Sequence, residues 1–180
     1  MNLLDGPELD RMAELRRPPM SSIHRVRTGL LVLALCLSGS AAEAAASPFT
    51  ALAGSWAGGG VLSTSDGGQV QLRCRATYDV APRGDELRLN LRCASDSYTF
   101  DLSSEVQYRG GEISGSWTEA SRDASGTLSG RAAGNRVDVS ARGQNFSADL
   151  SLTTRGRHQS VSIRPRGGDI TGVSLSLERR

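Results

Sequence analysis

Few side chains in the second part of the chain could support acid–base or nucleophilic catalysis. From Ser47 onward there is one histidine, His158. It lies between the basic Arg157 and the polar Gln159, where a segment of alternating residues begins. A Ser-His-Asp arrangement would have to recruit this imidazole from an electropositive turn. The carboxylates are numerous, but most of them fall at outward or turn positions, and their spacing identifies no acid–base pair. One cysteine pair with a distant histidine also lacks metal-ligand spacing. We therefore expect a protein that is not an enzyme and holds no metal or cofactor.

The two cysteines of this region, Cys74 and Cys93, are placed to bond to each other. The segments that contain them alternate apolar and polar residues and are joined by a Pro-Arg-Gly-Asp turn at residues 82–85. If the hairpin closes over the centre of that turn, Val80 faces Leu87 and Cys74 faces Cys93. Directly opposed strand residues have Cβ atoms about 4.5–5.5 Å apart, which a small adjustment brings within disulfide range. The spacing therefore predicts a structural disulfide.

The elements that must position these residues are β-strands. From Trp56 to the end, apolar and polar residues alternate in short runs that glycine-rich turn signals separate, and no helical period is present. The pattern predicts an all-β fold, an antiparallel meander of eight to ten strands, because parallel strands need long crossover connections. Closure into a barrel removes the two exposed edges of such a meander, so we expect a barrel in preference to a sandwich. The change of pattern at Ser103–Ser104 predicts a bulge there.

The join between residues 25 and 56 has the layout of a secretory signal peptide. Arg25 and Arg27 precede an apolar run at residues 29–37, and small residues follow as far as Ala46. That run is too short to cross a bilayer as a helix, which needs about 20 residues. We expect residues 1–46 to be a signal peptide with an N-terminal extension, in which residues 1–19 either lengthen the n-region or precede the true start at Met20. Residues 47–180 are then a single barrel domain in the periplasm or outside the cell.

The charge balance of the mature region argues against a polyanionic partner. All 21 basic side chains of the chain are arginine, which is typical of a GC-rich genome. From Ser47 onward, 16 arginines stand against 14 acidic residues, and the arginines are scattered rather than clustered. We expect no nucleic-acid partner, no stable membrane insertion and a monomer.

The segment Leu52-Ala53-Gly54-Ser55-Trp56 resembles the G-x-W signature that opens calycin barrels, lipocalins and avidins among them. The resemblance implies a calycin-like barrel in which Gly54 and Trp56 help to close one end. It also implies an arginine near the last strand that reaches the tryptophan, here Arg164 or Arg179. Such barrels usually bind a small or extended ligand in the barrel or at its mouth.

Four residues are candidates for contacts at the mouth of this barrel. Ser95, Asp96 and Tyr98 belong to a polar segment between two apolar strands, which either lines the mouth or is a plain hairpin turn. Trp117 belongs to a second Gly-Ser-Trp, at residues 115–117, and is the fourth candidate.

A second resemblance, to small periplasmic inhibitors of secreted metalloproteases, gives the alternative function. Those inhibitors are compact barrels with L-x-G-x-W near the mature start and one disulfide in the first half, and they act through an extended N-terminal trunk. The alternative is thus a protein-interaction module of the cell envelope, such as a protease inhibitor. More loosely, the mature chain resembles small exported proteins of GC-rich proteobacteria. An apolar pocket inside the barrel would favour ligand binding, whereas a solid core with an exposed apolar patch would favour a protein partner.

Overall fold

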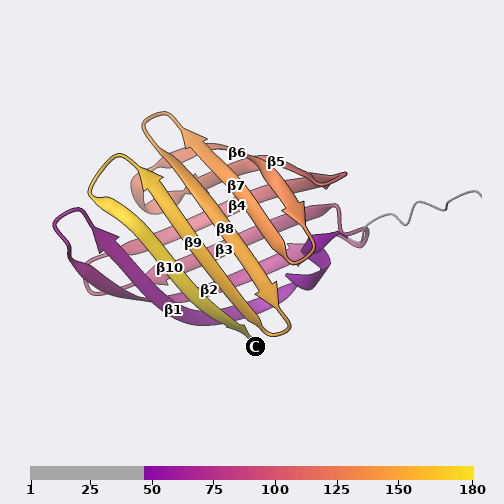
Figure 1. Cartoon of the computed structure of the whole chain (residues 1–180), viewed down its shortest axis with the longest axis horizontal. Helices are drawn as coiled ribbons and strands as arrows, with labels where there is room; N and C mark the ends of the chain where they lie inside the picture. Colours follow the sequence, from indigo (N-terminus) through magenta and orange to yellow (C-terminus); the bar gives the residue numbers. More distant parts are fainter. Residues whose placement is uncertain (1–46) are drawn as a thin grey trace, which may run out of the picture. The chain divides into compact units, whose positions relative to one another are not determined.

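Ten antiparallel strands close into a β-barrel in the computed structural model, which describes residues 47–180 (Figure 1). The expected signal peptide and N-terminal extension lie outside the described residues. The strands pair in chain order, and β1 completes the ring by pairing with β10. Their bounds are β1 (Gly54–Thr64), β2 (Gln69–Val80), β3 (Glu86–Ala94), β4 (Thr99–Arg109), β5 (Glu112–Glu119), β6 (Ala124–Ala133), β7 (Arg136–Gly143), β8 (Ser147–Arg155), β9 (His158–Arg166) and β10 (Ile170–Arg179). The predicted all-β barrel is confirmed.

Helical structure in this part of the chain is limited to two short 3₁₀ turns. η1 (Pro48–Ala51) precedes β1, and η2 (Ala120–Arg122) connects β5 to β6. Within residues 47–180, no helix is long and apolar enough to span a bilayer.

The β2–β3 hairpin has the register that the sequence predicts. Val80 pairs with Leu87 and Cys74 pairs with Cys93, and the two cysteines form a disulfide across 19 residues of sequence. Both cysteines point into the barrel and are buried. The predicted disulfide is confirmed, and it fixes β2 to β3 near the end of the barrel where the β3–β4 turn lies.

The bulge predicted at Ser103–Ser104 is wrong. β4 pairs with both β3 and β5 in unbroken register through these residues. Ser104 occupies an inward position, where its hydroxyl donates a hydrogen bond to the Ser116 carbonyl at 2.8 Å. Because this bond satisfies the buried hydroxyl, the strand accommodates a polar residue on its inner face without a bulge.

Glycines without room for a side chain mark two opposite corners of the barrel. A Cβ atom built on Gly58 or Gly60 of β1 would lie 2.0 or 1.9 Å from a backbone oxygen of β10. The same close approach occurs at Gly115 of β5 and at Gly126 and Gly130 of β6. Glycine therefore allows sharp bending at β1 and at β5–β6. Between these corners, the strands β7–β10 lie in front of β2–β4 in Figure 1.

Candidate functional site

The two ends of the barrel hold equal numbers of aromatic side chains but differ in how deeply these are buried. Four of the eight aromatic residues lie at the end that holds η1 and the β2–β3, β4–β5, β6–β7 and β8–β9 turns, which we call the closed end. These are Phe49, Trp56, Tyr78 and Tyr108. The other four lie at the opposite end, which we call the open end. These are Tyr98, Phe100, Trp117 and Phe146.

Trp56 lies at the centre of the closed end and is 1% exposed. Its indole N–H donates a hydrogen bond to the Leu52 carbonyl at 2.7 Å, and the ring meets Tyr78 edge-on with centroids 6.4 Å apart. The guanidinium of Arg179, on β10, lies 4.7 Å from the centre of the Trp56 ring. Arg179 also donates to the carbonyls of Ala53, at 2.6 Å, and of Ala51. Of the two arginines considered from sequence, Arg179 is thus the one at the tryptophan.

The residues before β1 pack onto this end. Ser47 caps η1 by accepting a hydrogen bond from the Phe49 N–H at 3.2 Å. Phe49 is 1% exposed and lies against Tyr108 with ring centroids 5.9 Å apart. Gly54 has a φ of +109°, which glycine accepts readily, so the chain can turn from η1 into β1. The segment from Ser47 to Gly54 therefore forms part of the closed end.

A buried polar group lies beside Trp56 and was not predicted from the sequence. The Tyr78 hydroxyl donates to Oε1 of Gln159 at 2.8 Å, and Nε2 of Gln159 lies 3.5 Å from the Thr154 hydroxyl. Burial raises the pKa of Tyr78 well above its usual value, although the hydrogen bond to Gln159 opposes this, so the phenol is neutral. Alternation does place Gln159 inward, but it cannot show that Tyr78, 81 residues away, meets it.

Between the two ends, the inner face of β7, β8 and β9 carries a continuous block of aliphatic side chains that stay half-buried. We call this block the aliphatic wall. It consists of Val137, Val139, Leu150, Leu152, Val161 and Ile163. In register, Val139 pairs with Leu150, and Leu150 pairs with Ile163. The inward Leu89, Leu91 and Leu102 of β3 and β4 are half-buried as well. Most of these residues pack against the buried core while staying partly exposed. Partly exposed apolar side chains on the inner face of a barrel could line a ligand site, and we call this candidate site the hollow.

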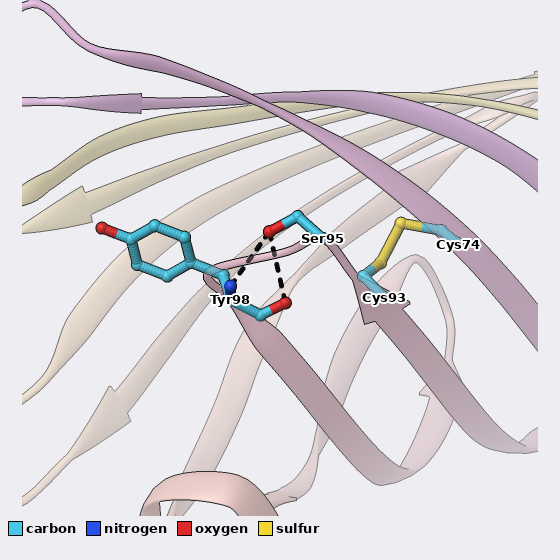
Figure 2. The surroundings of a disulfide bond; sticks show 4 residues. All are labelled: Cys74, Cys93, Ser95 and Tyr98. Carbon is cyan, nitrogen blue, oxygen red and sulfur yellow. Dashed lines mark hydrogen bonds between the residues drawn. A yellow bond between two sulfur atoms is a disulfide. The ribbon is translucent and has the colours of Figure 1, made fainter.

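The predicted mouth residues lie at the open end but differ in exposure. Ser95 and Tyr98 form the β3–β4 turn, where the Ser95 hydroxyl oxygen accepts a hydrogen bond from the Tyr98 N–H at 2.9 Å (Figure 2). Asp96 is exposed. The Tyr98 ring is half-buried and extends away from the disulfide in Figure 2. The serine therefore shapes the turn, and the tyrosine ring is the group of this segment available to a ligand.

Glu119 and Arg122 form a charged group at the open end that no sequence pattern predicted. Oε1 of Glu119 accepts hydrogen bonds from the N–H groups of Asp101, at 2.8 Å, and Ser121, at 3.2 Å. Arg122 lies 3.5 Å from Oε2 and 4.5 Å from the centre of the Phe100 ring. Burial opposes ionisation of Glu119, but the hydrogen bonds and the arginine outweigh it and lower the pKa of the carboxyl group. Arg122 is therefore a cation at the rim whose charge is largely balanced.

Trp117 is also at the open end and is 6% exposed. Phe146, in the β7–β8 turn, lies edge-on to it with ring centroids 5.6 Å apart and is 39% exposed. Beside Phe146 is a shallow depression of about 440 Å³ that Arg142 and Arg166 also line. The sequence pointed to Trp117 through the repeated Gly-Ser-Trp, whereas no pattern pointed to Phe146.

The outside of the barrel carries a second shallow depression, of about 470 Å³, across β1, β10, β9 and β8. Serines and a threonine supply most of its side chains, among them Ser151, Ser160, Ser162 and Ser174. His158 is on this side of the barrel wall too, exposed and 3.4 Å from Glu178. Among residues 47–180, no group of three or more His, Cys, Asp or Glu side chains is placed to hold a metal ion.

Proteins of known structure share the barrel but little of the sequence. The chain is similar to Rv2717c from M. tuberculosis, with a TM-score of 0.59 and 14% identity over 73% of this chain and 94% of that chain. It is also similar to the S-type phycobiliprotein lyase CPES from Guillardia theta, with a TM-score of 0.50 and 12% identity over 73% of this chain and 89% of that chain. No family model and no curated protein sequence matches the chain. At these identities the likeness establishes the fold alone, a closed barrel of ten antiparallel strands.

Proposed function

We propose that this protein is an exported, non-enzymatic, monomeric barrel that binds a small or extended apolar ligand in its hollow through the open end. The observation that carries the proposal is the half-buried aliphatic wall, with Leu89, Leu91 and Leu102 facing the same interior. When a ligand covers apolar surface inside a barrel, the free energy of binding gains about 25 cal/mol for each Å² of that surface removed from water.

The arrangement of polar groups supports binding rather than catalysis. The polar group at the closed end is satisfied internally, since Tyr78 donates to Gln159. The imidazole of His158 is outside the barrel wall, away from the hollow. A lipocalin-like role, in which the barrel holds its ligand by shape and apolar contact, is consistent with this distribution. The names of the two proteins with similar structures do not indicate a function for this chain, because the likeness is limited to the fold.

The alternative, an inhibitor or other interaction module of the cell envelope, has less support. An inhibitory trunk would have to be free to enter a protease, whereas Phe49 of the segment before β1 is buried against the barrel. Within residues 47–180, Phe146 is the one large hydrophobic residue that is exposed. A single exposed ring is less than a protein-docking patch usually provides.

A pair of matched substitutions tests ligand binding in the hollow. Val139→Phe adds a ring to the aliphatic wall, and Val106→Phe makes the same change at a buried inner position. We expect Val139→Phe to keep the thermal midpoint of the wild type and to weaken binding of the fluorescent probe anilinonaphthalene sulfonate. Val106→Phe should instead lower stability by about 1–3 kcal/mol through overpacking. Equal destabilisation by the two changes, with no probe binding by the wild type, would mean that the barrel is filled.

Export is tested by the intact mass of the protein recovered from the periplasm or the medium. We expect cleavage after Ala44, Ala45 or Ala46, where small residues follow the apolar run. Recovery of the uncleaved chain from the cytoplasm would contradict the export proposal. It would not affect the binding proposal, which the Val139→Phe and Val106→Phe variants test.

A further inference from the structure

The indole of Trp117 is fixed on the inner face of the barrel next to the hollow. Its β-ladder partners are Ser104 on β4 and Gly126 on β6. A Cβ atom on Gly143 would lie 3.0 Å from Cζ2 of the indole, so the ring lies directly against the backbone of β7. Two residues along from its partners are Leu102 and Leu128, which point inward and are half-buried. Trp117 therefore borders the apolar surface that we propose as the binding site.

The indole N–H of Trp117 has no hydrogen-bond acceptor within the described part of the chain. Its Nε1 atom is buried and unpaired. The hydroxyl of the neighbouring Ser104 is directed to the Ser116 carbonyl. Trp56, in contrast, donates its indole N–H to Leu52 at 2.7 Å. A buried donor without an acceptor costs about 1–3 kcal/mol, so such groups in folded proteins usually have a partner.

The surroundings of this N–H define the acceptor that would suit it. On the inner face, Leu102, Leu128 and Gly126 flank Trp117, and the buried carboxylate of Glu119 lies two residues along β5. A second, unpaired carboxylate would be expensive to bury there, so this donor favours a neutral oxygen. Of the arginines at the open end, Arg122 is paired with Glu119 and stacked on Phe100, and Arg166 is paired with Asp149. Phe146, the ring that covers Trp117, belongs to a turn and is 39% exposed, so an incoming apolar group can replace it at low cost.

We propose that Trp117 is the polar anchor of the site, donating its indole N–H to a single carbonyl-type oxygen on an otherwise aliphatic ligand. This inference rests on the proposed function, since it takes the hollow to be the binding site. It assigns the ligand to the class of long-chain ketones, esters and similar neutral molecules with one acceptor.

The test compares two ligands, one with a carbonyl oxygen and one without it. It also compares the wild type with a variant that lacks the indole N–H at position 117. The probes are methyl hexyl ketone and the hydrocarbon in which a methylidene group replaces its carbonyl oxygen. The variant is Trp117→Phe, which keeps an aromatic ring and removes the N–H. Because the chain has two tryptophans, the indole region of a ¹H–¹⁵N spectrum of the full protein contains two signals, and that of Trp56 is an internal reference.

We expect the ketone to shift the Trp117 indole proton downfield and slow its exchange with solvent, while the Trp56 signal stays in place. The hydrocarbon should bind without this downfield shift. The wild type should prefer the ketone over the hydrocarbon by about three- to tenfold more than Trp117→Phe does, which is the worth of one neutral hydrogen bond.

Two outcomes would overturn the inference in different ways. If both probes bind the wild type with the same relative affinity as the variant and the Trp117 proton does not shift, the anchor is wrong and the proposed function stands. If neither probe binds the wild type or Trp117→Phe, the proposed function fails together with the anchor.

Discussion

At the residue scale, Trp56 and Arg179 join the first and last strands at the closed end. The tryptophan donates to Leu52 and lies under the Arg179 guanidinium, which in turn holds the carbonyls of Ala51 and Ala53. Removal of the indole would therefore leave a cavity and also release the arginine from its stacking contact.

Replacement of Trp56 by alanine tests this structural role. We expect the free energy of unfolding, measured by denaturant titration, to fall by about 3–5 kcal/mol, as for other large-to-small changes in cores. That loss is a large part of the 5–15 kcal/mol that stabilises a typical domain. A variant that kept its midpoint but no longer bound anilinonaphthalene sulfonate would make Trp56 a binding residue instead.

Glu119 links the stability of the open end to pH. Burial would raise the pKa of its carboxyl group, but hydrogen bonds from the Asp101 and Ser121 N–H groups and the charge of Arg122 lower it overall. Because the pKa is lower in the folded state, ionised Glu119 contributes stability above about pH 4.5, the ordinary value, and that contribution is lost as pH falls through the folded pKa. We expect Glu119→Gln to be less stable than the wild type at neutral pH, with the difference shrinking below about pH 4.5. A difference that stayed constant across this range would contradict the role of the charge.

At the element scale, local pattern was sufficient for the strands and one hairpin register. Alternation about Cys74 and Cys93, with the turn at residues 82–85, gave the pairing that the structure has. The same reasoning failed at Ser104 because alternation treats an inward serine as an interruption, whereas a hydrogen bond to Ser116 makes it a normal inner residue. The glycine corners were also beyond local pattern, since they depend on which strand lies alongside.

Adding one methyl group, by replacing a glycine with alanine, tests whether Gly60 is required for the close approach of β1 to β10. A Cβ atom on Gly60 would lie 1.9 Å from the Ser174 carbonyl oxygen, while one on Gly172 would meet nothing closer than 3.8 Å. We expect Gly60→Ala to lower the midpoint of thermal unfolding by the equivalent of about 1–3 kcal/mol or more. Gly172→Ala, on the adjacent β10, should change it by about 0.5 kcal/mol or less. Similar midpoints for the two variants would mean that Gly60 does not set the corner.

At the scale of the whole molecule, aromatic rings occupy the two ends and aliphatic side chains occupy the middle. The sequence supports the prediction that these aliphatic residues face inward, since they alternate with polar ones. It does not support a prediction that they stay half-buried, because burial depends on which side chains of other strands reach them in the assembled barrel. The candidate mouth residues Tyr98 and Trp117 lie at the open end, whereas Phe146 and the Glu119–Arg122 pair emerge only from the assembled barrel.

A thiol placed on the aliphatic wall would show whether the inside of the barrel is open to small molecules. Cys74 and Cys93 are joined, so in a protein that begins at Ser47, Val139→Cys would supply the one free thiol of residues 47–180. We expect this thiol to react with methyl methanethiosulfonate in the native protein, and methyl hexyl ketone to slow that reaction. Val106→Cys, at a buried inner position, should react only on unfolding. If the thiol at position 139 were as unreactive as the one at position 106, the interior would be filled and the binding function excluded.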